Sequence, residues 1–227
     1  MINTLDDYIF RSIREDFAVN PNLTKKVDEQ GRLLPYAGNT VVYLLDDDTR
    51  QQLRQIRDEL YRSAGEMLAE PLQESTFHMT LHDLANGCPG REGLAEWMRF
   101  TEARAAALLE RWGTVPPIRM KATWLFNMVN TSIVLGLRPA EGEDWQRLDG
   151  MYMELENVVS LGYGLTPHIT MAYFRPGTWS PDQIRRLAEA MRPVELDVEL
   201  RGENLVLQRF SDMNHYETIR NREVLQR

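Results

Sequence analysis

The chain has 227 residues, of which 43% are hydrophobic and 26% are charged, an ordinary balance for a globular protein that can bury a sizeable core. Its 34 acidic and 26 basic residues give a net charge of −8, which argues against unassisted binding to long nucleic acid. It contains no apolar run as long as the roughly 18 residues that a membrane span requires, and residues 1–17 do not read as a secretory signal. The one cysteine, Cys88, lies in a predicted turn, so no internal disulfide can form. A cytoplasmic location is expected.

The first half of the chain begins with a helix predicted over residues 4–17, from its apolar spacing, and an irregular arm that together occupy residues 1–38. The pattern then predicts a strand at 40–45, a helix at 53–68, a strand at 76–84, a helix at 94–109 and a strand at 118–129. Asp46, Asp47 and Asp48 are candidates for capping the first of these helices.

The second half repeats this order. It is predicted to contain a strand at 132–137, a helix at 145–159, a strand at 167–174, a helix that starts at Ser180-Pro181-Asp182-Gln183, and strands at 194–200, 205–210 and 215–220. Residues 39–129 and 131–220 therefore form two repeats of one strand and helix pattern. We expect an internal pseudo-two-fold arrangement within a single bilobal domain.

Two short stretches occupy matching places in the repeat. They are Phe77-His78-Met79-Thr80-Leu81 and Pro167-His168-Ile169-Thr170-Met171. Side chains two apart on a strand point the same way, so each stretch presents an imidazole and a hydroxyl on one face. A pseudo-two-fold arrangement would bring the two strands face to face. The alternative is that each pair is a buried polar group satisfied by the backbone.

Two histidines across a cleft suit acid and base chemistry at phosphorus. Imidazole titrates near pH 6.5, so one ring can accept a proton while the other donates one. The threonines would donate hydrogen bonds to the phosphate oxygens, and no metal is required. His82 is four residues from His78, about 13 Å along a strand, which argues against a shared metal ion. Because His82 falls on the same predicted face, it is a candidate for lining the cleft.

The paired motifs resemble those of the 2H phosphoesterase superfamily, and the likeness extends over residues 36–220. Residues 31–42 look like the lead-in segment of a little-characterised microbial branch, which reads Ser-Phe-His-Met-Thr where this chain has one more residue at 75–80. The resemblance implies an α+β fold with two largely antiparallel sheets facing each other across a cleft and helices outside. It implies that His78 and His168 are the acid and the base, in either order, and that Thr80 and Thr170 bind phosphate.

Further side chains are candidates for lining the cleft. The cyclic phosphodiesterase branch carries an arginine soon after its motif, and Arg175 follows the second motif here. The first motif is followed by His82 and Asp83, without an arginine. Tyr43 and Tyr173, like Trp124 and Phe126, lie on predicted strands and are candidates for stacking on a base, with packing in the core as the alternative role for each.

These features predict a metal-independent phosphodiesterase without a cofactor. Its expected partner is a small phosphorylated substrate or a short oligonucleotide, with a 2′,3′-cyclic or 2′-5′-linked phosphate or an RNA end. Long nucleic acid and membranes are not expected as partners, and the substrate, the reaction direction and the oligomeric state are left open. The alternative function is a non-catalytic module that keeps the pocket and only binds a nucleotide.

Overall fold

The computed structural model describes residues 17–219. The helix predicted over residues 4–17 and the end of the last predicted strand thus fall largely outside the described residues. Within these, the strands form an eight-stranded sheet in the order β6-β3-β4-β5-β2-β1-β7-β8, and all neighbouring strands are antiparallel. The strands are β1 (Ala37–Leu44), β2 (His78–Gly87), β3 (Ile118–Met128), β4 (Ser132–Pro139), β5 (His168–Tyr173), β6 (Asp197–Leu200), β7 (Leu205–Asp212) and β8 (His215–Ile219).

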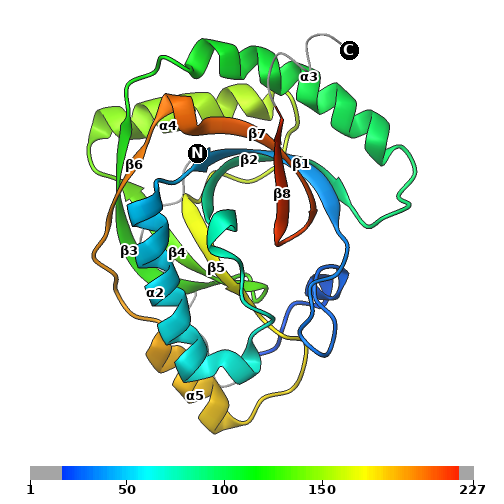
Figure 1. Ribbon diagram of the computed structural model, residues 1–227, viewed down its shortest axis with the longest axis vertical. Helices are drawn as coiled ribbons and strands as arrows, with labels where there is room; N and C mark the ends of the chain where they lie inside the picture. The colour runs from blue at the N-terminus through cyan, green and yellow to red at the C-terminus, as the bar shows by residue number, and fades with distance from the viewer. Residues whose placement is uncertain (1–16, 220–227) are drawn as a thin grey trace.

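The sheet curls into an open half-barrel (Figure 1). One half contains β3, β4, β5 and β6, and the other contains β1, β2, β7 and β8. The halves meet where β2 pairs with β5. The predicted α+β class with largely antiparallel strands is confirmed, and the two expected sheets are two halves of one curled sheet.

The two halves of the sheet do not coincide with residues 39–129 and 131–220. β3 pairs with β4 and β6, while β7 pairs with β1. The reason is local for β3, because a tight turn joins it to β4. Val129 and Asn130 in this turn have φ angles of 45° and 60°, and positive φ at both central residues is typical of a hairpin turn.

The long helices pack around the sheet, with α3 and α4 at one end and α2 and α5 at the other (Figure 1). They are α2 (Asp47–Ala64), α3 (Leu94–Trp112), α4 (Gly142–Glu156) and α5 (Pro181–Ala190), and the short 3-10 helices are η1 (Pro21–Lys25), η2 (Gly65–Met67), η3 (Glu74–Thr76) and η4 (Gly202–Asn204). Asp46 caps α2, and Ser180 and Gln183 form the expected capping box of α5. No helix within residues 17–219 is long and apolar enough to cross a membrane.

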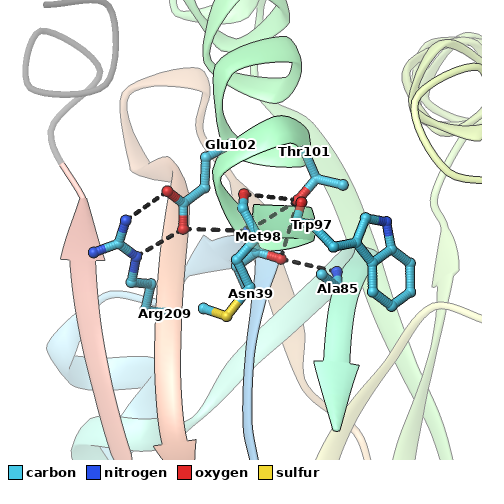
Figure 2. A network of polar contacts seen from close by, with 7 residues as sticks. All are labelled: Asn39, Ala85, Trp97, Met98, Thr101, Glu102 and Arg209. Carbon is cyan, nitrogen blue, oxygen red and sulfur yellow. Dashed lines mark hydrogen bonds and ion pairs between the residues drawn. The ribbon is translucent and has the colours of Figure 1, made fainter. Parts of the chain in front are cut away.

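A buried polar network fastens α3 to the sheet (Figure 2). Asn39 on β1 is fully buried; its side-chain amide donates to Thr101 Oγ1 at 3.0 Å and to Glu102 Oε1 at 3.3 Å, and its side-chain oxygen accepts from the Ala85 backbone at 2.8 Å. The Glu102 carboxylate accepts two hydrogen bonds from Arg209 on β7, at 2.7 and 2.6 Å. These bonds hold β1, β2 and β7 in place against α3.

Candidate active site

The pairing of β2 with β5 brings the two His-x-Thr motifs together. Met79 lies opposite Ile169, and both side chains are fully buried in the core. Neighbours of a matched antiparallel pair also lie opposite each other, so on the other face His78 adjoins Thr170 and Thr80 adjoins His168. The two motif strands are therefore neighbours within one sheet rather than opposed across a gap.

All four motif side chains line one cavity of about 200 Å³. The cavity wall also contains residues from distant parts of the chain, including Lys26 from the arm, Asp83 from β2, Tyr173 from β5, and Phe210, Met213 and Tyr216 from the β7–β8 region. The cavity thus combines two imidazoles, one ammonium and one carboxylate with several hydroxyls, among them those of Thr80 and Thr170. This set can bind an anion and exchange protons with it.

Each motif histidine donates a hydrogen bond to the carbonyl two residues upstream. His168 Nδ1 lies 2.6 Å from the Thr166 carbonyl oxygen, and His78 bonds to the Thr76 backbone in the same way. Because a carbonyl only accepts, the ring nitrogen that faces it carries the proton, and the other nitrogen is the one that gains or loses a proton. Both motifs are therefore Thr-x-His-x-Thr, and the first threonine orients the ring.

The environment of His78 keeps its ring neutral. Burial lowers the pKa of His78 to about 4, although the bond to the Thr76 carbonyl and the negative charge of Asp83 act in the opposite direction. The ring of Tyr216 packs edge-on against it, with 5.0 Å between the ring centroids. A neutral imidazole at pH 7 can accept a proton, which is the chemistry of a general base.

Lys26 and Asp83 are site residues that the sequence did not reveal. Lys26 Nζ lies over the rings of Tyr36 and Tyr173, 4.9 and 5.7 Å from their centroids. A lysine on an irregular arm carries no periodic signal that relates it to the sheet.

Asp83 reaches the cavity because the β1–β2 ladder shifts register between Val41 and Val42, which is the mark of a bulge. Strand alternation alone would have placed the Asp83 side chain on the opposite face of the sheet.

The same shift removes His82 from the motif face. Leu81 and His82 are consecutive and both are buried, which breaks the alternation that sequence reasoning assumed. The His82 side chain is fully enclosed, and its Nε2 lies 3.1 Å from Glu156 Oε1. His82 therefore belongs to an internal hydrogen-bond network, and within residues 17–219 no group of three or more His, Cys, Asp or Glu side chains is arranged to hold a metal ion.

The remaining candidates take different positions. Tyr173 lines the cavity. Tyr43 is fully buried, and its hydroxyl lies 3.5 Å from Met151 Sδ, so it packs in the core. The Arg175 guanidinium stacks 4.8 Å from the Trp179 ring centroid, and Arg175 is absent from the wall of the cavity that holds the motifs.

Comparison with known proteins identifies the fold. No protein-family model matches the chain, and no curated protein matches it. A conserved protein of unknown function from Agrobacterium tumefaciens matches with a TM-score of 0.65 at 18% identity, over 95% of this chain and 98% of that one. TT0787 of Thermus thermophilus matches with a TM-score of 0.52 at 16% identity, over 81% and 95% of the two chains.

Escherichia coli LigT, in its complex with 3′-AMP, matches with a TM-score of 0.51 at 13% identity, over 82% of this chain and 96% of LigT. LigT and TT0787 have the 2H phosphoesterase fold. At these identities the likeness concerns the fold, and the fold that the sequence motifs implied is confirmed.

Proposed function

We propose that this protein is a metal-independent phosphodiesterase that acts on a small phosphodiester through His78 and His168. The observation that carries the proposal is that both His-x-Thr motifs line one cavity of about 200 Å³ together with Lys26. Its fold, shared with LigT, supports the same reaction class. A pair of merely buried polar groups would not require an ammonium beside them.

The two histidines divide the proton transfers. Neutral His78 takes a proton from the attacking water as the water oxygen bonds to phosphorus. The bond from phosphorus to the leaving oxygen breaks, and protonated His168 gives its proton to that oxygen. A cyclic phosphate and water thus yield a phosphomonoester with a free hydroxyl, and each transfer is typically worth about 10²–10⁴ in rate.

The other polar groups hold the phosphate. Thr80 and Thr170 donate hydrogen bonds to its non-bridging oxygens, and Lys26 balances its charge. Burial lowers the pKa of Lys26, but the negative charges that Tyr173, Asp83 and Tyr36 can carry outweigh burial and raise it overall. Because the pKa of Lys26 is raised above its ordinary value, the side chain is an ammonium at neutral pH.

The proposed substrate is a nucleotide with a 2′,3′-cyclic or 2′-5′-linked phosphate. LigT has been solved with 3′-AMP, a nucleoside monophosphate of the kind that opening a cyclic phosphate would release. The experiment is hydrolysis of a panel of such nucleotides, in EDTA, by wild type, His78→Ala and His168→Ala, with His215→Ala as the matched control because His215 is exposed.

We expect each motif variant to lose at least about 100-fold in kcat/KM and the control to match wild type. Full activity of either motif variant, or loss of wild-type activity on chelation, would contradict the mechanism. Binding of the panel by calorimetry without turnover of any member would favour the nucleotide-binding module instead.

A further inference from the structure

A second and larger cavity opens beside the first. It has a volume of about 480 Å³ and shares Thr80, Asp83, Met128 and His168 with the smaller cavity. The rest of its wall is mainly apolar or aromatic, and consists of Leu81, His82, Val129, Tyr152, Leu161, Tyr163, Gly164, Leu165 and Thr166. Its wall contains no lysine or arginine, and Asp83 is its one carboxylate. The motif ring His168, which it shares with the smaller cavity, is the group there that can carry a positive charge beside the phosphate.

Two large side chains stand exposed on this cavity. Tyr163 is 62% exposed and Val129 is 57% exposed, so the apolar surface of both is within reach of a ligand. Val129 also has a φ of 45°, an outlier for a β-branched residue that costs on the order of 1–3 kcal/mol. Asn20 holds this turn, since its side-chain amide donates to the Val129 carbonyl at 3.2 Å and its backbone donates to the Asn130 carbonyl at 2.9 Å.

The loop that carries Tyr163 is also fixed in place. The Leu161 backbone donates to Glu156 Oε1 at 3.0 Å, and the Tyr152 hydroxyl donates to the Tyr163 carbonyl. Glu156 is in turn held by His82. Hydrogen bonds thus hold the backbone that carries both exposed side chains, as they do in the walls of a binding site.

The charged side chains are distributed unevenly between the two cavities. Lys26 lines only the smaller cavity, whereas Asp83 lies at the boundary between the two. Lys26 lies over the rings of Tyr36 and Tyr173, and the negative charge of Asp83 acts on it across the smaller cavity. A ligand with an anion at one end and hydrogen-bond donors at the other would match this arrangement, with the anion beside Lys26 and the donors beside Asp83.

We infer that the larger cavity binds the organic part of the substrate, and that this part is an uncharged ring system with a hydroxyl or amine that donates to Asp83. The inference rests on the proposed function, because it assumes that the phosphate occupies the smaller cavity. The ring would stack on Tyr163 and contact Val129. A second phosphate in the larger cavity would meet the carboxylate of Asp83, and the protonated ring of His168 at the boundary already serves the first phosphate. The substrate is therefore a mononucleotide with a single phosphate and not the end of an RNA chain.

The first test compares ligands with and without a second phosphate. We expect wild type to bind 3′-AMP at least about tenfold more tightly than adenosine 3′,5′-bisphosphate, as measured by calorimetry. Asp83→Asn should bring the two affinities to within about threefold. The control Asp182→Asn removes the same charge from the exposed start of α5 and should keep the wild-type preference. Equal affinities in wild type, or an unchanged preference in Asp83→Asn, would overturn the inference.

The second test uses turnover. Tyr163→Ala should lower kcat/KM for adenosine 2′,3′-cyclic phosphate about tenfold, the scale of one lost stacking contact, and leave glycerol 1,2-cyclic phosphate unaffected because it has no ring. Equal losses on both substrates would overturn the role of the larger cavity and spare the phosphodiesterase. If wild type hydrolyses neither compound, the proposed function fails, and the calorimetric preference still decides the ligand class.

Discussion

The neutral state of His78 should be visible in the pH dependence of folding, independently of any substrate. The imidazole pKa is 6.5 in its ordinary state and about 4 in the folded protein. Between these two pH values the unfolded chain binds more protons than the folded protein, so the free energy of unfolding must rise with pH. The contribution of His78 is therefore fully present above about pH 6.5 and is lost as the pH falls toward 4.

The size of this effect follows from the two pKa values. Each tenfold change in proton affinity is worth about 1.4 kcal/mol, so the full difference corresponds to about 3 kcal/mol. About 2 kcal/mol is expected, because part of the ring faces the cavity and is screened there by water. Replacing His78 with glutamine removes the titrating group and keeps a polar side chain of similar reach.

The assay is urea denaturation of wild type and His78→Gln at pH 4.5, 5.5 and 7.0. The stability of wild type relative to the variant should fall by about 2 kcal/mol from pH 7.0 to 4.5, while losses shared by both proteins cancel. His215→Gln serves as the control; His215 lies on the surface beside Asp212, and its replacement should not produce a change of this sign. A difference between wild type and His78→Gln that stays constant with pH would refute the neutral state of His78, and the assignment of His78 as the base would fall with it.

Three further variants probe the phosphate site, the scaffold and the cavity wall. Thr170→Val should lower kcat/KM on a cyclic nucleotide about 10- to 100-fold by removing one hydrogen bond to the reacting phosphate, and Thr170→Ser should restore most of it; similar rates for both variants would argue against hydroxyl donation. Asn39→Ala should lower the free energy of unfolding by about 2 kcal/mol because it leaves the Ala85 N–H and Glu102 with fewer partners, and urea denaturation with an unchanged midpoint would contradict this. Val129→Gly should relieve the positive φ and raise the free energy of unfolding by about 1 kcal/mol while weakening 3′-AMP binding measured by calorimetry; a destabilised variant would show that the turn is not strained.

Strand periodicity and helix signals predicted much of this structure because they depend on neighbouring residues alone. The alternation around His78 and His168 fixed which side chains share a face, and Ser180 with Gln183 marked the start of α5. These features are set within a few residues of chain. Strand alternation fails wherever one extra residue is inserted into a strand. No residue type in this segment predicts the register shift between Val41 and Val42.

The partners of each strand were harder to predict, because they depend on contacts that are distant in sequence. The repeat suggested that β3 belongs with β1 and β2, yet the tight turn at Val129 and Asn130 makes it the hairpin partner of β4. Lys26 was missed for a related reason. It reaches the motifs only because the arm folds back over the sheet, and its spacing from either motif carries no meaning.

The pairing of β2 with β5 places core residues on one face of the sheet and the site residues on the other. Met79 and Ile169 are fully buried opposite each other, and Leu81 and Met171 continue the apolar face. A slip of one residue in either strand would turn that strand's histidine and threonine into the core and expose its apolar side chains. The cost of exposing several large apolar side chains, about 1.5–3 kcal/mol each, therefore selects the register. The apolar residues of the motifs thus determine where the histidines meet, although they take no part in the chemistry.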